Sequence, residues 1–293
     1  MSDLALIERV QDWLPTAEAH RERADRFLGP HRRRMAAGQP HPVWDFLFTY
    51  YSLRPRQLLR WHPGFGVVLA GDEAQRRYVG KTGYVAHADG VTVGTDYLHA
   101  RLETVDFIAG LLRATAARPA QLNCFGMHEW AMVYRSDEAR HTQVPLRLGQ
   151  AGTDRVVETA TPLRCSHFDA FRFFTADAAP RNSVALTRDT QVQQEQPGCV
   201  HANMDLYKWC YKLGPLVDSG LLLDCLDLAA DARELDMRAS PYDLSGYGYP
   251  PIRVEEPSGR AEYVRCQSDL AQRAAPLRAA LQRRCELLLA AAA

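Results

Sequence analysis

The sequence predicts a helix-rich α+β fold with a small antiparallel sheet formed by the middle of the chain. Stretches with apolar residues at helical spacing lie on both sides of a glycine-rich region, residues 65–93, whose short β-type runs are cut by Gly and Asp-Gly pairs. With 293 residues and 46% hydrophobic content, the chain is long enough to bury a sizeable core. We therefore expect a single domain over residues 1–293.

The first 40 residues are expected to form a basic helical arm. Six arginines lie between positions 21 and 34, and the Gly29-Pro30 pair is expected to interrupt the helix, because proline cannot donate the backbone hydrogen bond that a helix interior needs. Charge runs of this kind are usually solvated helix faces. A phosphate-contacting arm is the alternative, since arginine suits phosphate recognition.

The remaining elements follow from periodicity and from turn residues. Within the glycine-rich region, the β-type runs are GVVLAG, RRYVG, GYVAH and GVTVG, and residues 144–148 and 155–158 are expected to be further strands. Helices are expected over residues 97–117, from near Val200 to Leu213, and from a cap at Ser219. Residues 260–293 are expected to form a C-terminal helix that clamps the core.

Three segments mix aromatic residues with imidazole and carboxylate groups, namely LNCFGMHEWAMVY, RCSHFDAFRFF and QPGCVHANMDLYKWCYKL. Plain packing rarely calls for such polar groups, because each one needs a partner when buried. We therefore expect the three segments to converge on one pocket. Each segment places a cysteine before a histidine with a carboxylate nearby: Cys124/His128/Glu129, Cys165/His167/Asp169 and Cys199/His201/Asp205.

These histidines are candidate metal ligands. Imidazole and carboxylate suit zinc or iron, and thiolate favours zinc. A haem held by a single axial histidine is a subsidiary form of the same idea. The spacing matches no recognised zinc motif, and cysteine and histidine also occur as ordinary core residues. The candidate ligands are His128, His167 and His201.

A resemblance covers nearly the whole chain. The motifs HPVWDFLFTYYS, RWHPG, CFGMHEWAMVY, RCSHFDAFRFF, QPGCVHANMDLYKW and LDMRASPYDL resemble a group of actinobacterial proteins labelled 3-methyladenine DNA glycosylase. The resemblance implies a DNA-repair hydrolase that excises alkylated purines from damaged DNA. The helix-hairpin-helix form LPGVG of characterised alkyl-base glycosylases is not found in this sequence.

A glycosylase needs aromatic rings that stack an extruded base and a carboxylate that positions water or stabilises the oxocarbenium ion. Asp205 is the first choice for the carboxylate, because it lies one helical turn after His201 and near Lys208. Asp169 and Glu129 are the other catalytic candidates. The candidate substrate-binding residues are Trp130, Tyr134, Phe171, Tyr207, Lys208 and Trp209.

Two alternatives to the glycosylase stay open. One is a metal-dependent enzyme that acts on a small aromatic or polar substrate, and the other is a non-catalytic binding protein. Lys+Arg and Asp+Glu balance at 35 each, so overall charge gives DNA binding no support. The seven scattered cysteines are typical of a reduced, cytoplasmic chain, and no apolar run reaches membrane-spanning length. The expected partner is damaged DNA or a small molecule.

Overall fold

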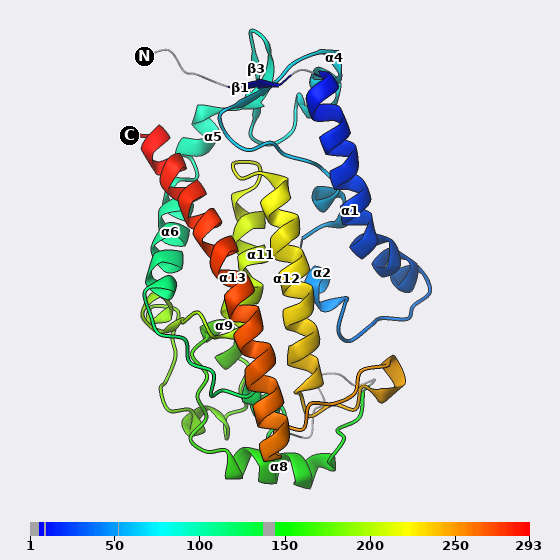
Figure 1. Ribbon diagram of the computed structural model, residues 1–293, viewed down its shortest axis with the longest axis vertical. Coiled ribbons are helices and arrows are strands. Elements are labelled where there is room, and N and C mark those ends of the chain that lie inside the picture. Colours follow the sequence, from blue (N-terminus) through cyan, green and yellow to red (C-terminus); the bar gives the residue numbers. More distant parts are fainter. Residues whose placement is uncertain (1–5, 9, 52, 137–143) are drawn as a thin grey trace.

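Three long helices run side by side through the middle of the protein in the computed structural model, which describes residues 6–8, 10–51, 53–136 and 144–293 (Figure 1). They are α11 (Val200–Leu213), α12 (Ser219–Arg238) and α13 (Pro257–Ala291). Helix α6 (Leu102–Ala116) packs against α13 on the outside of this group. The helix-rich α+β prediction is confirmed.

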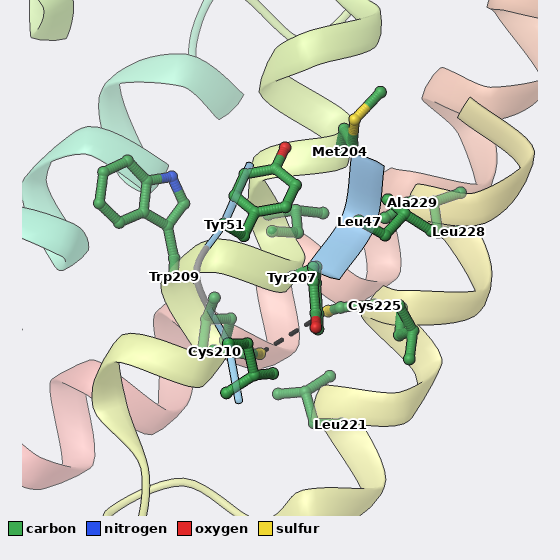
Figure 2. Close-up of a cluster of buried hydrophobic side chains, with 14 of the residues drawn as sticks. Leu47, Tyr51, Met204, Tyr207, Trp209, Cys210, Leu221, Cys225, Leu228 and Ala229 are labelled. Carbon is green, nitrogen blue, oxygen red and sulfur yellow. Dashed lines mark hydrogen bonds between the residues drawn. The ribbon is translucent and has the colours of Figure 1, made fainter. Parts of the chain in front are cut away.

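Helices α11 and α12 are bounded by residues that the sequence makes conspicuous. Pro197 and Gly198 precede α11, and Gly214 and Pro215 follow it. The cap of α12 is Asp218, whose carboxylate accepts a hydrogen bond from the Leu221 amide at 3.0 Å, rather than the expected Ser219. Figure 2 shows the apolar surface that joins the two helices, in which the sulfur atoms of Cys210 and Cys225 lie 3.7 Å apart.

The glycine-rich region forms the expected antiparallel sheet at one end of the molecule. Strand β2 (Val67–Leu69) pairs with β4 (Gly90–Val93), which pairs with β3 (Tyr84–His87), and β1 (Leu6–Glu8) adds to β2 in parallel. Gly90 is required at its position, because a Cβ there would lie 2.0 Å from the Leu69 carbonyl oxygen. The expected strand RRYVG is wrong. Its first three residues end α4 (Asp72–Tyr78), which buries Ala74 and Tyr78 at helical spacing.

Helix α1 (Val10–Ala36) continues through Pro15 and Pro30, so the expected interruption at Gly29-Pro30 is also wrong. The buried face continues across the pair, with Leu28 before it and His31 after it, and this packing holds the helix together. The expected strands at residues 144–148 and 155–158 are wrong as well. Residues 149–159 form α8 (Gly149–Thr159), which buries Thr153 and Val157 at helical spacing.

Short helices connect these parts and bring the polar segments inward. They are α2 (Phe46–Thr49), α3 (Pro55–Leu58), α5 (Thr95–His99), α7 (Met127–Ala131), α9 (Phe168–Phe171) and α10 (Gln191–Gln194). Ala179–Arg181 and Ser245–Tyr247 form single 3₁₀ turns. Of the helices in the described ranges, none has the length and apolar character needed to cross a membrane.

Candidate metal centre and adjoining cavity

The structure brings the three histidine-bearing segments together in the interior. The ring of His201, in the first turn of α11, lies edge-on to the ring of His128 with their centroids 4.4 Å apart. The ring of His167, just before α9, stacks beside His201 at 5.4 Å. These distances lie well within an ordinary ligand pocket.

A tight turn before α7 sets the direction of His128. Phe125 and Gly126 both have positive φ values, 50° and 69°, which is an uncommon conformation for phenylalanine. A Cβ at Gly126 would lie 3.2 Å from that of Ala239, so the turn also packs closely against the end of α12. As a result His128 and Glu129, the second and third residues of α7, point into the core, where both are buried.

Asp236 of α12 lies beside two of these histidines, His128 and His201. Its Oδ1 lies 2.6 Å from Nε2 of His128, and its Oδ2 lies 3.9 Å from Nε2 of His201. Burial alone would lower the pKa of His128, but the Asp236 carboxylate outweighs burial and raises it. Burial lowers the pKa of His201 to about 3, with a further contribution from His128. His201 is therefore a neutral imidazole, the form that binds metals.

His128, His201 and Asp236 form a group that could hold a metal ion, since one ligand atom from each lies within 4.8 Å of the others. Two imidazoles and one carboxylate are a donor set found for zinc and for non-haem iron. Arg233 lies beside this group and donates to both Asp236 and Glu129 at 3.0 Å. Glu129, a candidate catalytic carboxylate, is thus buried in an ion pair.

A second cluster of charges adjoins the first through His167. Its Nε2 lies 3.3 Å from Oδ2 of Asp205 and 3.5 Å from Oε1 of Glu195. Lys208 donates to Asp205 at 2.5 Å and to Asp169 at 2.7 Å. Burial would raise the pKa of Asp205, but Lys208 and His167 hold it far below its usual range.

Buried carboxylates outnumber buried Lys and Arg side chains in these two clusters. In the described part of these two clusters, five buried carboxylates face three buried Lys and Arg side chains, and the less buried Arg188 also pairs with Asp169 at 2.8 Å. The carboxylates are Glu129, Asp169, Glu195, Asp205 and Asp236, and the cations are Lys208, Arg233 and Arg278. Buried charge of this kind is costly unless it is compensated. Protons on His128 and His167, whose pKa values the neighbouring carboxylates raise, or a bound cation would compensate it.

A cavity of about 570 Å³ borders the second cluster. Asp169, Lys208 and Trp209 line it, together with Phe107 of α6. Asp205 lies behind Lys208 and accepts a hydrogen bond from the Tyr51 hydroxyl at 2.9 Å. Of the two aspartates at Lys208, Asp169 is therefore the one that faces the cavity.

The expected aromatic residues divide between this cavity and the packed core. Trp209 lines the cavity, with the Lys208 ammonium 4.3 Å from its ring centre. Trp130 is fully buried and donates to the Ala239 carbonyl at 2.9 Å. Tyr134 is buried and donates to Glu158 at 3.1 Å, Tyr207 is buried against Tyr51, and Phe171 is half-buried against Phe174.

The three cysteines that precede the histidines are thiols in this environment. Burial raises the pKa of Cys165 to about 12 and raises those of Cys124 and Cys199 as well. The Cys124 sulfur accepts from the Gln267 amide at 3.7 Å, and Cys165 donates to the His167 carbonyl at 3.5 Å. The possible ligand group in the described residues contains no cysteine.

Comparison of the chain with family models, curated proteins and solved structures finds no match. The resemblance to the 3-methyladenine glycosylase group therefore stays an expectation. The case for a function rests on the geometry described above.

Sequence reasoning missed several members of the site, above all Asp236 and Arg233. A signal was present in the acidic helix α12. Arg233 and Asp236 are three residues apart and share a stripe with the small residues Ala229 and Ala232, and that stripe is buried. Charged residues on a small-residue stripe indicate partners from another element, because a buried charge needs one.

Proposed function

We propose that this chain is a metal-dependent enzyme whose divalent ion, zinc or iron, is held by His128, His201 and Asp236. The observation that carries the proposal is the approach of these three ligand atoms to within 4.8 Å of one another. The charges beside the ligands support it, since the two carboxylates Glu129 and Asp236 share a single guanidinium, that of Arg233. Three protein ligands leave a coordination position for water or substrate, which is the arrangement of catalytic rather than structural zinc sites.

The metal would act as a Lewis acid and lower the pKa of a bound water. His167 is the neighbouring group suited to proton transfer, with its ring 5.4 Å from that of His201. Its Nδ1 has no hydrogen-bond partner within the described part of the chain, although the side chain is buried. An unpaired buried ring nitrogen points to a water or ligand as its partner.

Metal analysis tests this proposal directly. Purified protein is expected to hold about one zinc or iron ion per chain, as the donor set implies, and His201→Ala and Asp236→Asn are expected to lose it. His31→Ala is the matched control, because His31 also forms a buried imidazole–carboxylate pair, 2.8 Å from Asp45, but belongs to no three-residue ligand group among the described residues. Protein that stays metal-free after incubation with zinc and with ferrous iron, or a metal that survives both site variants, would overturn the proposal.

A second candidate function is the N-glycosylase implied by the resemblance. Asp169 favours it, because this carboxylate faces a cavity with aromatic walls, and such a pocket can hold an extruded base. Alkylated adenine is cationic, so aromatic rings attract it. Asp205, the first-choice carboxylate of the sequence, lies behind Lys208 and would act through it.

Release of free 3-methyladenine from methylated duplex DNA tests the second candidate. The parent protein is expected to release the base with or without a chelator, and Asp169→Asn is expected to lower the rate by at least about a hundredfold, the scale of a lost catalytic proton-transfer group. Asp205→Asn in the same assay shows which of the two aspartates base release depends on. If the folded parent protein releases no base above background, the glycosylase proposal is wrong, and the metal proposal is unaffected.

A further inference from the structure

The cavity between α6 and α11 carries an excess of positive charge in its wall. Four cations line its wall, Arg172, Arg188, Lys208 and Lys212, and the only carboxylates among the described lining residues are Glu103 and Asp169. Lys208 and Asp169 pair with each other at 2.7 Å, which leaves three cations and one carboxylate in the wall. A bound anion would balance this local excess of positive charge.

Lys212 is the cation in this wall with the fewest competing contacts. Its ammonium lies 5.3 Å from the ring centre of Trp209 and forms no ion pair with a described carboxylate. Lys208 is different, since Asp169 and Asp205 hold it on both sides. Arg188 also contacts Asp169, at 2.8 Å. Lys212 therefore remains available to a ligand.

Aromatic rings supply the rest of the wall. Trp209 and Phe107 meet edge to face with centroids 6.0 Å apart, and Phe107 is 40% exposed, which places it at the rim. Tyr50, Tyr51 and Tyr211 complete the aromatic lining. Aromatic side chains in a cavity wall can pack face or edge against the ring of a ligand. A volume of about 570 Å³ is of the size that small-molecule sites have.

We propose that this cavity binds small molecules that carry both an aromatic ring and an anionic group, a carboxylate or a phosphate. Lys212 pairs with the anionic group, and Trp209 and Phe107 hold the ring. The inference rests on the proposed function, for it assigns the substrate class of the same enzyme. Asp169, Lys208, Asp205 and His167 form an unbroken series of contacts from the cavity wall towards the proposed metal ligands.

A second cavity provides the control. It has a volume of about 600 Å³ and lies beside Cys124 and α8, with Arg155, Arg164 and Arg260 in its wall. It is also apolar in part and basic in part, so charge alone would not distinguish the two. Arg155→Gln removes one exposed cation there, just as Lys212→Gln removes one from the proposed site.

Calorimetry with two ring anions, AMP and 4-hydroxybenzoate, tests the proposal on the full chain with and without added zinc. At least one is expected to bind more tightly than its uncharged counterpart, adenosine or 4-hydroxybenzamide, and more tightly than inorganic phosphate. Lys212→Gln is expected to weaken that binding about tenfold, the scale of one charged hydrogen bond, and Arg155→Gln to leave it unchanged. Added salt is expected to weaken it too.

Three results would overturn the proposal: neither anion binds, the uncharged counterpart binds as well, or Arg155→Gln weakens binding while Lys212→Gln does not. Metal content measured on the same samples keeps the two proposals apart. If zinc-loaded protein binds neither anion, the cavity proposal is wrong and the metal proposal stands. If the protein binds a ring anion but takes up no metal, the metal proposal is wrong.

Discussion

Helix α11 buries two kinds of side chain on its different faces. One face carries His201, Asp205 and Lys208, which contact charged groups of α9, α12 and the chain before α9. The other face packs Tyr207 and Cys210 into the apolar cluster formed with α12 (Figure 2). The side chains named on both faces are buried, so burial alone does not distinguish the faces. The two faces differ in what the neighbouring elements contribute: opposite charges on the first face, and only apolar contacts on the second.

The two faces should therefore respond differently to substitutions that preserve shape. Asp205→Asn keeps the side-chain volume and removes the charge that pairs with Lys208 and His167. We expect it to lower the free energy of unfolding by about 3 kcal/mol, the scale of breaking a buried ion pair from one side. Urea denaturation measures this as a lower midpoint at an unchanged slope.

Leu228 on α12 is the matched position for that test, since it is buried in the apolar cluster and shown in Figure 2. Leu228→Met also keeps volume, and we expect it to cost less than about 1.5 kcal/mol. If Asp205→Asn cost no more than Leu228→Met, the charges on the polar face would not be needed for its packing, and the contrast between the faces would fail.

The sequence predicted the polar face of α11 better than it predicted the distant residues that complete the site. The polar face of α11 followed from helical spacing and from the Pro-Gly and Gly-Pro pairs that bound the helix, because both signals are local. The partner of His128 did not follow, since Asp236 lies 108 residues away among the other acidic residues of α12. Spacing within one helix carries no information about which distant side chain completes a pair.

The errors in the fold have a similar origin. Val156 and Val157 favour a strand by composition, yet they belong to α8, where Val157 is fully buried. β-branched residues fit a helix when tertiary packing rewards one face, and propensity is a weak prior beside it. The antiparallel sheet was predictable because its turns depend on glycine at defined positions, such as Gly90.

Tyr207 has a polar hydroxyl although it lies on the apolar face of α11, so it tests the contrast between the two faces. Its ring packs edge-on to Tyr51 at 5.6 Å, and its buried hydroxyl has no hydrogen-bond partner among the residues that the structure describes. Removing an unpaired buried hydroxyl relieves a desolvation cost. We therefore expect Tyr207→Phe to leave the free energy of unfolding unchanged or to raise it by up to about 1 kcal/mol.

Tyr51→Phe is the control for this last prediction, since the two rings touch and only one hydroxyl is paired. The Tyr51 hydroxyl donates to Asp205 at 2.9 Å, and its loss is expected to cost about 1.5–3 kcal/mol, the range for hydrogen bonds to charged groups. Thermal and urea unfolding of the two variants side by side measures the difference. Equal losses in both would mean that the Tyr207 hydroxyl is paired, and the apolar face would then contain a polar contact of its own.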